Sequence, residues 1–249
     1  MSGYRSFSYF YDTLTGNISY KSRAEYFDML VKKHNGKKNL LLDLACGTGS
    51  LSEEMSRLGY DVIGVDGSED MLNAAIEKKF ESGANIQYLC QDMTKLDMFG
   101  TIDVTICALD SLNHLPDLKA VEKTVQRVSL FCEPSGLFIF DVNTPYKHRE
   151  VLGNNTFIYD MDDVYCVWQN TYSEQDNRVD ISLDFFERRE DDSYLRYDES
   201  FSEIAFDEKV MDDLLVRCGF EIAAKYDYDT VLPPKENSEK LVYVARKVH

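Results

Sequence analysis

The sequence has few positive charges for its length. Among 249 residues, 27 are Lys or Arg and 44 are Asp or Glu, which gives a formal net charge of −17. Proteins that bind nucleic acid or anionic membranes neutralise phosphates with basic side chains, so this balance argues against both partners. No apolar run approaches the ~20 residues that cross a bilayer, and the N-terminus lacks the apolar core of a signal peptide. We therefore expect binding to neither nucleic acid nor membrane.

Signals for disulfides and metal sites are also missing. The sequence has six cysteines without a CxxC pair, and only four histidines, none of them in a cluster with ligand spacing. Several cysteines lie within apolar runs, where a free thiol behaves as a small hydrophobic group. These features predict a reduced, cytoplasmic protein without a metal; the cysteines are Cys46, Cys90, Cys107, Cys132, Cys166 and Cys218.

The sequence does contain a regular alternation of buried strands and helices. Two helices are predicted first, at residues 4–15 and 19–34. Strands that are apolar on both faces then alternate with helices, which is typical of a parallel sheet of βαβ units. The strands are predicted at 39–44, 62–65, 86–91, 104–109 and 137–140, and the helices between them at 50–59, 69–82 and 117–132. Near the end, a helix at 207–218 precedes two strands at 220–228 and 240–247.

Residues 151–206 interrupt this rhythm and predict an antiparallel insertion. Within them, Val179, Ile181 and Leu183 alternate with polar residues, which is the period of a strand with one solvent-facing side. We therefore divide the chain into a main domain, residues 1–150 and 207–249, and an insertion of three or four strands. The division leaves the insertion directly after the fifth strand of the main domain, where it can cover a cleft at the strand ends.

The insertion carries most of the excess negative charge. Residues 151–208 hold sixteen acidic and four basic side chains, a net charge of −12. Two interpretations are open at this point. The acids form a solvated sheet face, or they form a rim that attracts a cationic small-molecule substrate.

The strongest motif is LDLACGTGS at residues 42–50. A buried strand enters a turn with Gly47 and Gly49, and the helix that follows begins with unpaired backbone amides. Glycine lets the backbone approach a ligand closely. A dinucleotide fingerprint would need glycine where Ser52 stands, and no P-loop lysine is present. The turn alone fits a structural turn as well as a ligand-binding loop.

Two acidic residues follow at the ends of the next two predicted strands. Asp66 lies 17 residues after Gly49, where a carboxylate can accept hydrogen bonds from both hydroxyls of a ribose. Asp92 and the apolar Met93 follow the next strand, and they suit the amino group and the flat face of an adenine. Each acid alone is as readily a helix N-cap. The glycine turn and two acids on three successive strand ends together indicate a site for an adenosyl ligand.

In this order, the motifs LDLACGTGS, VIGVDGSEDML, CQDMTKLD and DVTICALDSLNHL resemble those of the class I SAM-dependent methyltransferases. The resemblance covers about residues 39–145, and the run FSYFYDTL is similar to the start of small stand-alone bacterial members with a β insertion. It implies S-adenosylmethionine (SAM) as cofactor. The expected fold is a doubly wound, Rossmann-like α/β sheet of seven strands in the order 3-2-1-4-5-7-6, the last strand antiparallel, with the small antiparallel β insertion as a lid.

The resemblance also implies a set of cofactor contacts. These are Ala45, Gly47 and Gly49 for the methionine half, Asp66 for the ribose, Asp92 and Met93 for the adenine, Leu109 and Asp110 beside the reactive methyl, and Gly67, Met71 and Gln91 from the same motifs. Tyr20 is a further candidate that closes over the ligand or packs within an amphipathic helix. Arg23, one turn later, is a candidate partner of the methionine carboxylate.

Methyl transfer from a sulfonium is an in-line displacement, so the protein must align the nucleophile and exclude water. A base is needed only where the nucleophile carries a proton that it cannot lose to solvent. His114, a few residues after the fourth strand, and Tyr11 are therefore the candidate catalytic residues. Packing is the alternative role for both.

The acceptor is expected to be a small molecule. The Asn/Asp-Pro-Pro-aromatic run of enzymes that methylate the adenine amino group in DNA is absent, because residues 108–111 read Ala-Leu-Asp-Ser. Two other functions stay open from the sequence. One is a SAM-binding sensor or scaffold without turnover, and the other is a nicotinamide-dependent oxidoreductase, which Ser52 disfavours.

Overall fold

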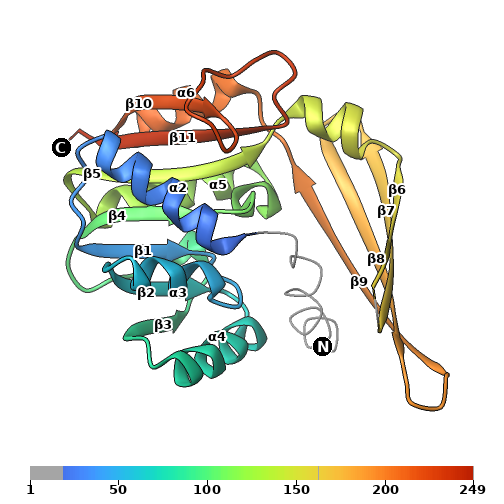
Figure 1. Cartoon of the computed structure of the whole chain (residues 1–249). Helices are drawn as coiled ribbons and strands as arrows, with labels where there is room; N and C mark the ends of the chain where they lie inside the picture. The colour runs from blue at the N-terminus through green and yellow to red at the C-terminus, as the bar shows by residue number, and fades with distance from the viewer. Residues whose placement is uncertain (1–18, 162, 249) are drawn as a thin grey trace.

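The computed structural model describes residues 19–161 and 163–248, and Figure 1 shows how they are arranged. The helix predicted at 4–15 lies outside the described residues. The main domain contains α2 (Tyr20–Lys33), β1 (Leu40–Leu44), α3 (Ser50–Arg57), β2 (Asp61–Asp66), α4 (Glu69–Ser82), β3 (Ile86–Cys90), η1 (Met93–Lys95), β4 (Ile102–Cys107), η2 (Ser111–His114), α5 (Leu118–Phe131), β5 (Cys132–Asn143), η3 (Lys147–Leu152), α6 (Glu208–Arg217), β10 (Phe220–Asp227) and β11 (Lys240–Lys247). The insertion contains β6 (Thr156–Asp160), β7 (Val164–Ser173), β8 (Arg178–Arg188) and β9 (Tyr194–Ile204).

The seven-stranded sheet has the strand order β3-β2-β1-β4-β5-β11-β10, which confirms the predicted doubly wound topology. The strands from β1 to β5 are parallel, and β11 runs antiparallel to both β5 and β10. All five parallel strands therefore end at one edge of the sheet. The connections reverse direction between β1 and β4, and a doubly wound sheet binds its ligands outside this point.

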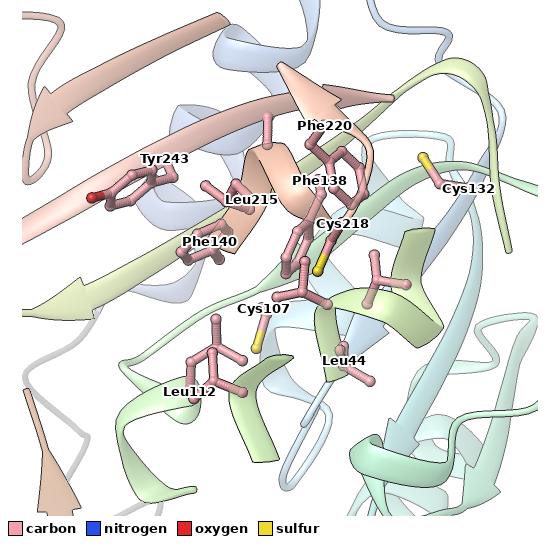
Figure 2. Packing of buried hydrophobic residues seen from close by; sticks show 14 of the residues in the cluster. Leu44, Cys107, Leu112, Cys132, Phe138, Phe140, Leu215, Cys218, Phe220 and Tyr243 are labelled. Atoms are coloured by element: carbon pink, nitrogen blue, oxygen red, sulfur yellow. The ribbon is translucent and has the colours of Figure 1, made fainter. Parts of the chain in front are cut away.

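Apolar side chains pack on both faces of the main sheet. On one face, α2 and α3 contribute Phe27 and Met55 to a buried cluster. On the other, α5 and α6 cover Phe138, Phe140 and Tyr243, and Figure 2 shows part of this second cluster. The rings of Phe140 and Tyr243 stack there with centroids 4.9 Å apart. Burial on both faces explains why these strands appear in the sequence as continuous apolar runs.

One strand of the main sheet is longer than the sequence pattern predicted. β5 begins at Cys132 and ends at Asn143, whereas the apolar run marked only residues 137–140. The extension brings Asp141 and Asn143 to the carboxyl edge of the sheet, and both are buried. Polar side chains at a buried strand end have no apolar signature, so the pattern underestimated the strand.

The insertion is a four-stranded antiparallel sheet that stands beside the carboxyl edge of the main sheet (Figure 1). Ile181 and Leu183 of β8 are buried on one of its faces, in a cluster with Leu152 of η3. On the same face, Phe201 and Glu203 of β9 contact residues of the main domain. This inner face therefore attaches the insertion to the main domain.

The opposite face of the insertion carries acidic residues. Asp184 of β8 pairs in the ladder with Asp198 of β9, whereas Ile181 pairs with Phe201. Because side chains alternate between the two faces of a strand, Asp180, Asp184 and Asp198 point away from the main domain. Arg196 donates hydrogen bonds to Asp184 and offsets part of this charge.

Within the described residues, no helix combines the length and the apolar character needed to cross a membrane. All six cysteines are free thiols, and all except Cys90 are buried. The thiols thus contribute to apolar packing, as the sequence predicted, since Cys107 and Cys132 both belong to the cluster in Figure 2.

We predict that Gly64→Ala lowers the free energy of unfolding by about 1–3 kcal/mol, the usual range for overpacking. A Cβ on Gly64 would lie 2.6 Å from two ring carbons of Tyr88 and 3.0 Å from the Cys46 sulfur. Urea unfolding without ligand measures the effect. The control is Gly67→Ala, whose Cβ would meet only the Gln91 carbonyl oxygen at 3.8 Å and should change stability by less than about 0.5 kcal/mol. Equal losses in both variants would contradict the prediction.

Candidate active site

The turn after β1 places three residues in the left-handed conformation. φ is +60° at Ala45, +54° at Gly47 and +75° at Gly49. A Cβ on Gly49 would collide with the Tyr88 hydroxyl and lie 2.9 Å from the Ala75 Cβ. Glycine is therefore required at this position by conformation and by space. The turn leads directly into α3, whose first backbone amides have no partner within the helix.

Asp66 holds this turn from the end of β2. Its carboxylate accepts hydrogen bonds from the backbone N–H of Gly47 and of Ser68, each at 2.8 Å. Burial raises the pKa of Asp66, and the backbone hydrogen bonds offset part of that rise. A carboxylate offers about four lone-pair sites, so these donors leave acceptor capacity for a ribose. Asp66 thus orders the glycine turn as well, which the sequence did not reveal.

The turn from β2 into α4 lies beside Asp66. Ser68 is the N-cap of α4, and its hydroxyl accepts a 3.3 Å hydrogen bond from the backbone N–H of Met71. The Met71 side chain is buried. Gly67 leaves open space, because an added Cβ would meet only the Gln91 carbonyl oxygen at 3.8 Å. Gly67 and Gln91 therefore lie close together after β2 and β3, and contacts of Gly67, Met71 and Gln91 with the cofactor stay a prediction.

The residues after β3 are engaged in local hydrogen bonds. Asp92 is the N-cap of η1, and its carboxylate accepts hydrogen bonds from the side chain and the backbone N–H of Thr94, both at 2.8 Å. These bonds lower the pKa of Asp92. The Gln91 side chain is held by the backbone of Asp97, and Met93 packs against the main core. The N-cap alternative for Asp92 is therefore confirmed, and its contact with an adenine stays a prediction.

A small cavity of about 30 Å³ lies between the glycine turn and the end of β4. Tyr20, Ala45 and Leu109, which come from three separate segments, all line it. Asp43 lines it too, and its carboxyl group accepts a 2.6 Å hydrogen bond from the Ser52 hydroxyl. Burial raises the pKa of Asp43 to about 7, although the Ser52 hydrogen bond acts in the opposite direction. The structure thus gathers predicted residues around a buried acid.

The turn after β4 is held in a strained conformation. Leu109 and Asp110 are consecutive non-glycine residues with φ of +57° and +53°. Such residues cost on the order of 1–3 kcal/mol each unless the surroundings hold them. The carboxylate of Asp141, at the end of β5, accepts hydrogen bonds from both backbone N–H groups, at 2.8 Å and 3.1 Å. Asp141 therefore fixes the part of the turn that lines the small cavity.

Lys240, the first residue of β11, neutralises this region. Its ammonium nitrogen lies 2.9 Å from the Asp110 carboxylate and 3.6 Å from the Asp141 carboxylate. Burial raises the pKa of Asp110, but the charges of Lys240 and Lys147 outweigh burial and hold that pKa well below its usual range. Burial raises the pKa of Asp141, with Lys240 opposing it. The Asp110 side chain is thus bound in an ion pair with Lys240. Its backbone forms part of the turn beside the small cavity.

Arg23 is not among the residues that line the small cavity. Its guanidinium carbon is 4.4 Å from the centroid of the Tyr228 ring, and one of its nitrogens is 3.4 Å from the Asp229 carboxylate. Only 9% of the side chain is exposed, and its Nε has no hydrogen-bond partner within the described residues. The expected pairing of Arg23 with the methionine carboxylate stays a prediction. Tyr11 lies outside the described residues.

His114 ends η2 and contacts the inner face of the insertion. Its ring centroid lies 5.1 Å from that of Phe201, and its Nε2 lies 3.8 Å from a carboxylate oxygen of Glu203. The other oxygen of Glu203 accepts a 2.8 Å hydrogen bond from Asn143 Nδ2, which also donates to Asp110 at 2.6 Å. The His114 side chain is 42% exposed. It is therefore accessible to a ligand, and β9 positions it.

Sequence reasoning missed four residues of this site: Asp43, Asp141, Glu203 and Lys240. Asp43 had a usable signal, because it is a charged residue inside an apolar strand, and a buried charge needs a compensating partner. Asp141 directly follows such a strand and had the same signal. Glu203 and Lys240 had none. Glu203 reaches the site only because its side chain contacts Asn143 and His114 of the main domain, and Lys240 only because β11 pairs with β5.

Comparison with known proteins identifies the family. Residues 41–136 match the family described as methyltransferase domain. YqeM of Bacillus subtilis (strain 168), a protein named as a methyltransferase, is 31% identical over 245 residues, which cover 98% of this chain and 97% of YqeM. The crystal structure of a S-adenosylmethionine-dependent methyltransferase from Clostridium acetobutylicum ATCC 824 is 31% identical, with a TM-score of 0.89 and 99% coverage of both chains. This chain belongs to the SAM-dependent methyltransferases.

The cofactor of this methyltransferase is SAM, and membership of the family replaces the nicotinamide-dependent and non-enzymatic interpretations. A partial relative is the ubiquinone biosynthesis O-methyltransferase of Colwellia psychrerythraea (strain 34H), which is 35% identical over 102 residues, or 40% of each chain. The two proteins match over less than half of either chain, so the similarity does not show that they share a methyl acceptor.

The residues of the site fit SAM. Asp66 keeps acceptor capacity for the ribose after binding two backbone donors. In the small cavity, burial has raised the pKa of Asp43, and such a carboxyl group ionises more easily beside a cation. SAM carries two cations, an ammonium and a sulfonium. Cofactor binding by the glycine turn, Asp66, Tyr20 and Leu109 stays a prediction, and Asp43 is a further candidate.

We predict that Asp66→Asn weakens SAM binding by about 10–100-fold, because hydrogen bonds to a charged group contribute about 1.5–3 kcal/mol. Isothermal titration calorimetry measures the dissociation constant. Asp61→Asn is the matched control, since Asp61 is exposed at the opposite end of the same strand. Unchanged SAM affinity in a folded Asp66→Asn variant would remove Asp66 from the binding site.

A second prediction concerns pH. The pKa of Asp43 is raised in the folded state, so between about pH 4 and pH 7 the native protein binds more protons than the unfolded chain. The free energy of unfolding therefore falls as pH rises through this window. Asp43→Asn should remove this contribution, on the order of 1.4 kcal/mol per pH unit. Urea unfolding of both proteins from pH 4.5 to 7.5 without SAM checks this; parallel curves would contradict it.

Proposed function

We propose that this methyltransferase transfers the methyl group of SAM to a small-molecule acceptor held between the Leu109–His114 segment and the inner face of the insertion. When bound, SAM supplies an electrophilic methyl group on a sulfonium. The observation that carries the proposal is the contact of His114 with Phe201 and Glu203 of β9, directly after the turn that lines the cofactor cavity. Cofactor turn, candidate base and insertion thus meet in one place.

The chain contributes alignment and proton transfer to this reaction. Asp141 holds the left-handed turn at Leu109 and Asp110, which keeps that side of the cavity rigid. His114 accepts the proton of an acceptor that cannot lose it to solvent, and Glu203 stabilises the imidazolium that forms. The insertion, residues 151–206, acts as a lid that limits the access of water from its side.

The small-molecule class of acceptor is supported by composition and by the relatives. The net charge of −17 opposes binding to nucleic acid, and the partial relative from Colwellia is named for an O-methyltransferase of ubiquinone biosynthesis. A cationic acceptor has less support, because Asp180, Asp184 and Asp198 point away from the main domain and cannot line the cleft. A cytoplasmic location agrees with six free thiols.

Methyl transfer itself is tested with SAM carrying a tritiated methyl group. The panel contains phenols, primary amines, carboxylic acids and duplex DNA, and product is counted after extraction. We expect incorporation into at least one small molecule and none into DNA. Methylation of DNA alone would overturn the small-molecule proposal.

For the base, we predict that His114→Asn lowers kcat about 100-fold or more for an acceptor that must lose a proton, the usual contribution of a general base. A thioether or tertiary amine acceptor, which carries no such proton, should be affected less than threefold. SAM affinity should not change. His34→Asn is the matched control, because His34 bonds to Tyr226 away from this site. Equal losses for both kinds of acceptor would assign His114 to packing.

A further inference from the structure

A second cavity, of about 390 Å³, lies beyond the Leu109–Asp110 turn, at the start of β11 and the loop before it. Its volume suits a small ligand. Three lysines, Lys147, Lys235 and Lys240, and two acidic residues, Asp227 and Glu239, are among the residues that line it. The lining is thus net positive in a chain whose net charge is −17.

Three other cavities of the described structure have the opposite balance. The small cofactor cavity is lined by the carboxyl group of Asp43 and by no lysine or arginine. A cavity of about 480 Å³ beside α3 and α4 has three glutamates against one lysine and one arginine. A cavity of about 500 Å³ on the insertion has two aspartates against one arginine. The positive lining near β11 therefore does not follow from overall composition.

Lys147 is the lysine of this cavity that is left for a ligand. Lys240 is paired with Asp110, and Lys235 lies 3.5 Å from Asp227. The Lys147 ammonium donates a 2.9 Å hydrogen bond to the Asn143 side-chain oxygen, and no carboxylate of the described residues lies within 4.0 Å of it. Burial lowers the pKa of Lys147 and the charge of Lys240 lowers it further, while the charges of Asp110, Glu203 and Glu239 offset part of this shift. An anion would relieve both effects, because it compensates a partly buried charge.

One lining residue of the cavity, Lys240, also supports the Leu109–Asp110 turn. Asn143, the partner of Lys147, donates to Asp110 at 2.6 Å, and Lys240 lies 2.9 Å from the same carboxylate. Asp110 follows Leu109, which lines the cofactor cavity. The Asp110 carboxylate and its two partners therefore connect the turn at the small cavity to the side of the second cavity where Lys147 lies.

We propose that this cavity is the acceptor subsite for an anionic group, a carboxylate or a phosphate, and that Lys147 is its charged partner. The proposal rests on the proposed function, since it names the class of acceptor for that reaction. The acceptor is then a small acid. Its methylated atom lies between the Leu109–His114 segment and the insertion, and its anionic group extends into this cavity. Charge-assisted hydrogen bonds to such groups are among the stronger polar contacts in proteins, so Lys147 determines specificity.

The binding test uses two simple anions as probes of the subsite, one a phosphate and one a carboxylate. Inorganic phosphate and benzoate are titrated by calorimetry into protein saturated with S-adenosylhomocysteine, the demethylated cofactor. We expect one of the two anions to bind, which distinguishes phosphate from carboxylate. Lys147→Gln should weaken this binding at least tenfold and Lys147→Arg should restore most of it. Lys209→Gln, which removes an exposed lysine of α6, should have no effect. Thermal unfolding shows whether each variant is folded.

The activity test uses matched acceptors. 4-Hydroxybenzoate is compared with 4-hydroxybenzamide, and phosphoethanolamine with ethanolamine, so each pair differs only in the anionic group. The anionic member of one pair should have a kcat/KM at least tenfold higher, and Lys147→Gln should abolish this preference while SAM affinity stays within twofold.

Each contrary result has a distinct meaning. Absence of anion binding, or equal binding by folded wild type and Lys147→Gln, overturns the subsite while methyl transfer itself stands. A parallel loss of SAM affinity in Lys147→Gln also overturns it, because Lys147 would then hold the cofactor carboxylate. Anion binding through Lys147 without methylation of any small molecule would leave the subsite in place and overturn the proposed function instead.

Discussion

The bridge from the Asp141 carboxylate to two consecutive backbone amides is the interaction on which the active edge depends. Leu109 and Asp110 adopt a conformation that non-glycine residues avoid, and Asp141 holds both of them. A buried carboxylate is itself unfavourable unless a positive charge compensates it. Lys240 supplies that charge to Asp141 and Asp110 together. Strand β11 is thus required for the electrostatics of the site as well as for the sheet.

The same network extends into the insertion. Asn143 lies between Asp110 and Glu203, and its Nδ2 donates to both carboxylates. Glu203 in turn faces His114 and the buried His148. The insertion is therefore attached through the polar contacts of Glu203 as well as through the apolar cluster that β8 forms with Leu152 of η3. Such an arrangement links the position of the insertion to the geometry of the Leu109–Asp110 turn.

Most of the main sheet could be predicted because strands buried on both faces leave uninterrupted apolar runs. The glycine turn and Asp66 were likewise visible, since a local motif specifies them. The polar end of β5 was not visible, and neither were Glu203 and Lys240. Their roles arise from contacts between distant segments, those of Glu203 with Asn143 and His114 and the pairing of β11 with β5. The period-2 pattern at residues 179–185 did separate a buried face from an acidic one, and only the contacts of Phe201 showed which face meets the main domain.

The ion pair of Lys240 also restricts how the last strand can enter the sheet. In the observed pairing, Lys240 lies opposite Asn143 and Val242 opposite Asp141. A slip of β11 by one residue would turn Lys240 to the other face of the sheet, toward the cluster around Phe140. Two buried carboxylates would then lose their counter-ion at once. The ion pairs of Lys240 therefore also select one register for β11. The apolar run at residues 241–245 alone would not distinguish this register from its neighbours.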